Sequence, residues 1–156
     1  MSAAIHTLHV VLAGVWLGSV VFTMAVVSPA LRKMKSSEAE RVGVRSAIGE
    51  QYARVGTTNL ILLLVFALFD GLLRGFGAVL YAEYALLAAV FGLVVVHGGY
   101  FGQRLARLAA AERSTESAEE ARAFLEKRRS LQRLSLWVSW ANVLISVVVA
   151  VLAVGA

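Results

Sequence analysis

The chain has 156 residues, 59% of them hydrophobic, and its mean hydropathy is +0.75. A soluble domain of this size does not carry long uninterrupted apolar stretches, so the composition indicates a membrane protein. The net charge of +5 does not indicate nucleic-acid binding, because the basic residues flank the apolar stretches. The absence of cysteine excludes disulfides, thiolate metal sites and cysteine catalysis.

Four apolar stretches reach or approach the roughly 20 residues that a helix needs to cross a bilayer. They predict spans over residues 5–28, 56–74, 79–102 and 134–154. All but one of the 15 Lys and Arg residues lie between spans one and two or between spans three and four. Basic short segments stay in the cytoplasm, so both segments are predicted inside the cell membrane and both chain ends outside.

The segments between the spans are predicted to be helical extensions over residues 37–55 and 103–133. Capping boxes open them at Ser37-x-x-Glu40 and, after a break at 114–117, at Ser117-x-x-Glu120. Pro29 predicts that the first helix ends near residue 28, because the residue before proline resists the helical conformation. The prediction is a single-domain, all-α membrane protein, an up-down four-helix bundle.

Polar residues inside the spans are costly and are therefore candidates for function. By helical angle and depth, five of them can converge near the outer end of the bundle. Four are candidate ligands, His6, His9, Asp70 and Glu83, and the fifth is Arg74. Two imidazoles with carboxylates form the donor set of a divalent transition-metal site. The alternatives are structural: the histidines make helix contacts, Asp70 pairs with Arg74 at i,i+4, and Glu83 is a carboxylate at the start of a helix.

A second polar group is expected in the inner half of the bundle and consists of Met24, Asn59, His97 and Asn142. The thioether of Met24 suits Cu(I), although a methionine on an apolar face also fills a core. His97 is either a ligand or a hydrogen-bonding partner of Asn59 or Asn142 that holds helices together. His9 and His97 are expected about 20 Å apart along the membrane normal, which predicts two separate clusters.

The segment from Leu8 to Gly18, which contains His9 and Trp16–Leu17–Gly18, resembles the first span of the CopD-like copper-resistance family. The order of the later segments is also similar to the short four-span members, with His97–Gly98–Gly99–Tyr100 followed by a last span around Trp137–Asn142. This resemblance implies an inner-membrane protein that handles copper and moves it across the membrane. It also implies roles for His9 and His97, which match histidines of the pattern, and a periplasmic metal carrier as partner.

A second resemblance rests on His9 followed seven residues later by Trp16, which is similar to the first span of the HemJ-type protoporphyrinogen oxidases. It implies haem b as cofactor, with His9 as an axial ligand and redox chemistry as the function. A third hypothesis is a structural membrane scaffold in which the polar residues only join helices.

The resulting functional prediction is copper binding and transport through the polar interior of the bundle, rather than enzymatic catalysis. The expected partners are the lipid bilayer, anionic lipids of the inner leaflet and a second copy of the chain. Gly14-x-x-x-Gly18 would allow close helix packing in such a homodimer.

Overall fold

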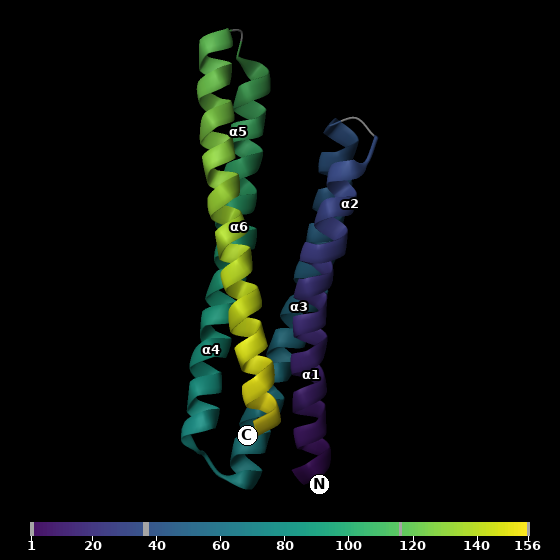
Figure 1. Ribbon diagram of the computed structural model, residues 1–156, viewed down its shortest axis with the longest axis vertical. Helices are drawn as coiled ribbons and strands as arrows, with labels where there is room; N and C mark the ends of the chain where they lie inside the picture. The colour runs from purple at the N-terminus through teal and green to yellow at the C-terminus, as the bar shows by residue number, and fades with distance from the viewer. Residues whose placement is uncertain (1, 36–37, 116, 156) are drawn as a thin grey trace. The chain divides into compact units, whose positions relative to one another are not determined.

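The computed structural model describes residues 2–35, 38–115 and 117–155, and the regular elements in them are all helical (Figure 1). The all-α prediction is therefore confirmed. In chain order the elements are α1 (Ser2–Phe22), the π-helical segment η1 (Thr23–Val27), α2 (Ser28–Lys33), α3 (Glu38–Arg74), α4 (Ala78–Val95), the π-helical segment η2 (Val96–Phe101), α5 (Gly102–Ser114) and α6 (Ala118–Gly155).

Four helical stretches are long and apolar enough to cross a membrane, which makes the chain a multi-pass membrane protein. They are Ala3–Leu31, Gly43–Arg74, Ala78–Glu112 and Ala118–Gly155. The helices α3 and α6 have 37 and 38 residues, well above the roughly 20 needed to span a bilayer. The predicted extensions are thus continuous with their spans, while the orientation in the membrane stays a prediction.

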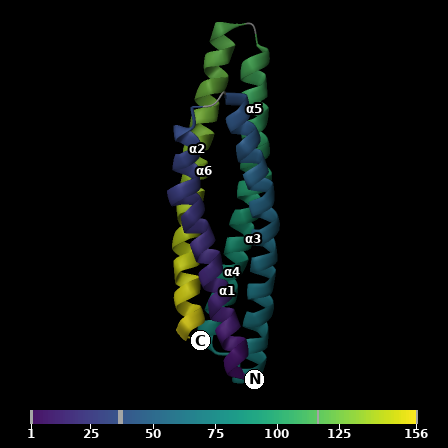
Figure 2. The ribbon, with the colours of Figure 1, turned by 90° about the vertical axis from the view of Figure 1, so that its right-hand side faces the viewer.

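The chain divides into two compact units, Met1–Ala89 with Val143–Ala156, and Val90–Asn142. The first unit contains α1, α3, most of α4 and the end of α6, so all four spans contribute to it. Within this unit both chain ends lie at the same end as the turn from α3 to α4 (Figures 1 and 2). This arrangement is the expected up-down helical bundle.

Helix α1 contacts each of the other three helices of the first unit. It packs along α3, and the Asn59 side-chain amide on α3 donates to the Leu12 carbonyl at 3.2 Å. The Trp16 indole N–H donates to Ser146 Oγ on α6 at 2.9 Å, and both side chains are at most 1% exposed. Such interhelical hydrogen bonds stabilise membrane bundles, where association gains no hydrophobic driving force from the lipid.

The core of the first unit is apolar and lies where these four helices face one another. Its described buried residues are Ala13, Trp16, Val20, Leu31, Leu60, Leu63, Ala67, Leu80, Leu87, Val149 and Ala153. The residues between them on the same helices are exposed and equally apolar, as Val11 and Val15 on α1 and Leu68 and Leu72 on α3 show. Apolar side chains on both faces are what a helix needs when its outer surface contacts lipid.

The helical path continues beyond Pro29, in contrast to the end predicted near residue 28. Pro29 lies in the first turn of α2, and the preceding segment η1 closes with the Ser28 N–H on the Thr23 carbonyl. A π-helical turn of this kind accommodates a proline within a continuing helix by changing the local hydrogen-bond register. The helix ends instead at Met34, where the backbone becomes extended.

Two short breaks separate the other helices. Helix α3 ends at Arg74 and α4 begins at Ala78, with Gly75 at a φ of 98° and its N–H bonded to the Gly71 carbonyl at 2.9 Å. The Ser117 hydroxyl accepts from the Glu120 N–H at 3.4 Å, which caps α6 as predicted. The other predicted cap, Ser37, lies outside the described residues.

Replacing Gly75 with Ala should destabilise the turn between α3 and α4, because a side chain is strained at this positive φ. The expected loss is about 1 kcal/mol of unfolding free energy. Thermal unfolding in detergent measures it, with Gly77→Ala as control, since Gly77 has ordinary φ and open space around its Cα. Equal effects of the two substitutions would contradict the assigned backbone strain.

Candidate metal centre

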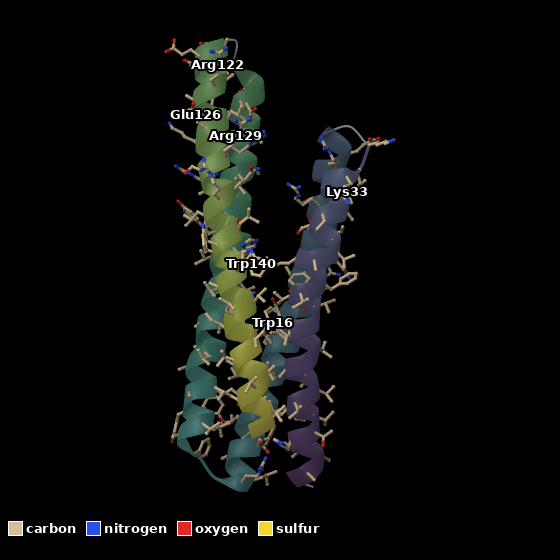
Figure 3. All side chains as sticks on the ribbon, viewed as in Figure 1. Trp16, Lys33, Arg122, Glu126, Arg129 and Trp140 are labelled. Atoms are coloured by element: carbon tan, nitrogen blue, oxygen red, sulfur yellow. The ribbon has the colours of Figure 1, made fainter. Side chains whose placement is uncertain are left out.

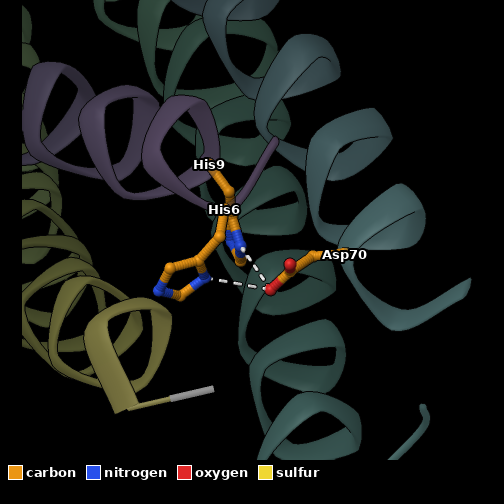
Figure 4. A group of neighbouring side chains, drawn as sticks. All are labelled: His6, His9 and Asp70. Carbon is orange, nitrogen blue, oxygen red and sulfur yellow. Dashed lines mark hydrogen bonds and ion pairs between the residues drawn. The ribbon is translucent and has the colours of Figure 1, made fainter. Parts of the chain in front are cut away.

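Three helices place the four predicted outer residues together at one end of the first unit. His6 and His9 are one turn apart near the start of α1, Asp70 lies one turn before the end of α3, and Glu83 lies in the second turn of α4. Figure 4 shows Asp70 facing the imidazoles of both histidines. These side chains thus come together from separate helices, while their role as a ligand site stays a prediction.

His6 lies between an acidic and a basic side chain. Its Nδ1 is 3.1 Å from Asp70 Oδ2 and 2.8 Å from Arg74 Nη1, and Arg74 is in turn 3.4 Å from the same carboxylate oxygen. One ring nitrogen cannot donate to Asp70 and accept from Arg74 at the same time, so the His6 tautomer decides which contact forms. His6 Nδ1 thus has two competing partners.

His9 is fully buried, and its two ring nitrogens face different carboxylates. Nε2 is 2.7 Å from Glu83 Oε1, whereas Nδ1 is 3.9 Å from Asp70 Oδ2, too far for a hydrogen bond. With an ionised Glu83 and a neutral imidazole, this short contact requires the tautomer in which Nε2 carries the proton and donates it to Glu83. The lone pair of Nδ1 then points toward Asp70 and His6.

Three buried polar atoms of the cluster have no hydrogen-bond partner within the described part of the chain. They are His9 Nδ1, Asp70 Oδ1 and Glu83 Oε2, on side chains that are at most 2% exposed. An unsatisfied buried polar atom costs about 1–3 kcal/mol, and more when the group is charged. Several such atoms in one cluster call for a further partner, which water, an ion or a ligand can supply.

His6, His9 and Asp70 offer one ligand atom each, and the three atoms lie within 4.8 Å of one another. Two donors bound to one ion at about 2.1 Å are at most about 4.2 Å apart, so a small side-chain rotation would bring all three into range. Glu83 contacts the opposite nitrogen of His9 and lies behind that ring. The compact donor group is thus formed by His6, His9 and Asp70.

The predicted inner residues are distributed over both units. In the first unit, Asn59 is buried and bonds to the Leu12 carbonyl, while Met24 lies half-buried in η1. In the second unit, the ring of His97 lies 6.1 Å from that of Phe101, and no hydrogen bond to Asn142 is present among the described residues. Asn59 therefore joins α3 to α1, and the inner ligand cluster stays a prediction.

Residues 11–114 match a protein family described as a domain of unknown function, DUF4149. The chain belongs to this family. The match covers Asp70, Arg74 and Glu83 and begins just after His6 and His9. No curated protein and no solved structure matches the chain. This match does not identify the chain as a CopD-like or HemJ-type protein. A copper or haem function of this DUF4149 protein is therefore a proposal.

Arg74 was expected in the outer group, beside Asp70 on the same helix face. Its spacing of four residues from Asp70 predicts an ion pair, and that pair is present at 3.4 Å. The shorter contact to His6 joins residues 68 positions apart and depends on how α1 packs against α3.

Replacing Glu83 with Ala should lower stability, because it leaves His9 Nε2 buried without an acceptor. The expected loss is about 1–3 kcal/mol of unfolding free energy. Glu83→Gln should lose less, since its amide oxygen can still accept the proton. Thermal unfolding in detergent measures both, with Glu126→Ala as control because Glu126 is exposed. Similar losses for Glu83→Ala and Glu126→Ala would contradict a stabilising contact to His9.

Proposed function

We propose that this membrane protein binds a divalent transition-metal ion, with copper as the expected ion, through His6, His9 and Asp70. The proposal is supported by one observation above all. Ligand atoms of three side chains from two helices face a common point, while buried atoms of the same cluster lack partners. A purely structural cluster of helix contacts would be expected to satisfy its buried polar atoms.

The formal charge of the cluster also favours a cation. Asp70 and Glu83 contribute two negative charges that are at most 2% exposed, and the nearest basic side chain, Arg74, is 42% exposed. Buried charge is costly unless it is paired or coordinates a metal ion. A divalent ion balances both carboxylates while the two imidazoles remain neutral.

In the proposed site each residue has a distinct role. Nδ1 of His6, Nδ1 of His9 and Oδ2 of Asp70 are the ligands. Glu83 accepts the Nε2 proton of His9, and this orients the ring and makes its free nitrogen more basic. Carboxylate–histidine–metal arrangements of this kind are common in metalloproteins. Glu83, which the sequence suggested as a ligand, is here the outer partner of a ligand.

Copper is the expected ion for two reasons. First, a nitrogen and oxygen donor set binds Cu²⁺ more tightly than the other divalent first-row ions, including Zn²⁺. Second, the first span resembles the copper-resistance family in the segment that contains His9. The same donors are poor ligands for Cu(I), which prefers sulfur, so the site is proposed for copper(II).

Arg74 would act as an internal competitor for the ion. Its guanidinium lies 2.8 Å from His6 Nδ1 and also contacts Asp70. His6 and Asp70 are both proposed ligands. Because His6 Nδ1 has one lone pair, metal binding requires Arg74 to leave. Its exposure at the end of α3, beside Gly75, leaves it room to turn outward.

Transport of the ion is the finer part of the proposal. It would require a second site along the bundle, and Met24, Asn59, His97 and Asn142 are the proposed residues for it. With both chain ends outside, His6 and His9 would take up the ion from the periplasmic side, from solution or from a carrier protein. Ion uptake into liposomes that contain the purified protein tests this step separately from binding.

The geometry gives less support to haem binding by His9. An axial ligand needs a ring nitrogen that faces a porphyrin, and the His9 ring has no exposed surface in this structure. Its Nε2 is held by Glu83 and its Nδ1 faces Asp70, so a porphyrin would have to displace one carboxylate.

The central test is copper and zinc binding by detergent-purified protein, measured by calorimetry and elemental analysis together with an absorbance spectrum. The expected result is one copper per chain, with affinity reduced at least about 100-fold in His9→Ala because a ligand is lost. His97→Ala is the matched control and should change the affinity less than about threefold, because its described contact is to Phe101.

Three outcomes would contradict this proposal. Failure of the folded protein to take up any added metal would favour the structural interpretation. A Soret band with stoichiometric iron would favour the haem hypothesis. Equal loss of affinity in His9→Ala and His97→Ala, with both proteins folded, would reject the separation of the two clusters.

Replacing Arg74 with Gln should increase the affinity for copper, because it removes a cation that competes for His6 and Asp70. The expected gain is about threefold to tenfold, corresponding to about 1 kcal/mol for a part-exposed charged contact. Calorimetric titration measures it, with Arg54→Gln as control because Arg54 is an exposed arginine of the same helix. A loss of affinity in Arg74→Gln alone would show instead that Arg74 helps to hold the site together.

A further inference from the structure

A groove of about 270 Å³ lies in the second unit, between η2–α5 and the first half of α6. Its polar lining consists of two cations and two hydroxyl groups, from Arg104 and Tyr100 on one side and Lys127 and Ser130 on the other. No carboxylate lines it. Arginine, lysine and hydroxyl groups together are the donors that bind phosphate oxygens.

The two cations of the groove are not engaged in ion pairs among the described residues. Neither Arg104 nor Lys127 has an acidic residue three or four positions away on its own helix. Of the acidic residues of this hairpin, Glu112 is paired with Arg128 at 3.2 Å. Glu119, Glu120 and Glu126 are exposed and do not line the groove. Positive charge that is uncompensated within the protein favours an external anion.

The rest of the groove is apolar and reaches the start of the last predicted span. Leu108, Leu131 and Leu134 complete its lining, and Leu134 begins the last predicted span. One turn further along α6, Trp137 is 74% exposed, and Tyr100 across the groove is 57% exposed. Exposed Trp and Tyr residues at the end of a span are typical of the membrane interface, where lipid headgroups lie.

The π-helical segment η2 ends beside this groove. The Gly102 N–H bonds to the His97 carbonyl, five residues earlier, and Tyr100 belongs to this segment. Insertions of this type are frequent at functional sites because they change the helix face that the following residues present. Here the residues that follow include Arg104.

We propose that this groove binds the phosphodiester group of an anionic phospholipid. Arg104 and Lys127 hold the phosphate, the hydroxyls of Tyr100 and Ser130 donate to its oxygens, and the leucines contact the start of an acyl chain. The volume is just below the roughly 300–1,000 Å³ of pockets that enclose a drug-sized ligand, so it accommodates a headgroup while the chains stay in the bilayer. Basic pockets between membrane helices bind anionic headgroups in this way.

This proposal is independent of the metal site, because the groove lies within Val90–Asn142 and the metal ligands lie outside that segment. It also differs from general attraction of basic segments to an acidic membrane. A general attraction depends on the number of charges, whereas the groove requires Arg104 and Lys127 in particular. Arg122 and Arg129, both labelled in Figure 3, supply a matched comparison. Both are exposed basic residues of α6, and neither lines the groove.

The test measures binding of phosphatidylglycerol and phosphatidylcholine to the full-length protein in detergent by native mass spectrometry and by thermal shift. We expect selective binding of phosphatidylglycerol, weakened at least about tenfold in Arg104→Gln/Lys127→Gln and unchanged in Arg122→Gln/Arg129→Gln. Circular dichroism checks that both double variants retain their helix content. A third arm uses inorganic phosphate at the same concentration.

Each other outcome overturns the proposal in a distinct way. Equal weakening in the two double variants would assign binding to the overall charge of the hairpin. Equal affinity for the two lipids would remove the role of the anionic headgroup. Stabilisation by inorganic phosphate to the same extent as by phosphatidylglycerol would make the groove a site for a soluble anion.

Discussion

The contact between His9 and Glu83 is the interaction on which the rest of the candidate site depends. It joins α1 to α4 at 2.7 Å between two fully buried side chains. Where no water is available, breaking such a pair leaves a buried polar or charged group without a partner. The pair therefore strongly favours one orientation of α1 about its own axis, the one that turns His9 toward α4. That rotation also directs His9 Nδ1 and His6 toward Asp70 on α3. One side-chain contact thus sets both the packing of three helices and the direction of the donor atoms.

The same rotation of α1 separates two chemically different surfaces. Toward the bundle it presents His9, Ala13, Trp16 and Val20, which are at most 5% exposed. Toward the lipid it presents residues such as Val11 and Val15. Both surfaces are mostly apolar, so hydrophobicity alone does not determine the rotation. The polar contacts of His9, Trp16 and Leu12 to α4, α6 and α3 provide the specificity that apolar packing lacks in a membrane.

This distinction explains which features could be predicted from the sequence. The four spans, the turn after Arg74 and the break before α6 follow from the length of apolar stretches and from local glycine and capping signals. The convergence of His6, His9, Asp70 and Glu83 follows from helical periodicity, because a polar residue inside a span has to face the interior. The placement of Glu83 behind His9, and of Arg74 on His6, depends on side-chain directions and on helix packing to within about an ångström. The continuation through Pro29 was missed because a local rule on proline does not account for a π-helical turn.

The length of α3 has a mechanical consequence. Its 37 residues form one uninterrupted helix about 55 Å long, roughly 25 Å longer than the hydrocarbon core of a bilayer. Asp70 lies near one end of this helix, and Glu38 begins it at the other end. A rigid rod held near one end converts a tilt of a few degrees there into a displacement of several ångströms at its far end. Events at the buried carboxylate of Asp70 are therefore mechanically connected to the far end of the same helix.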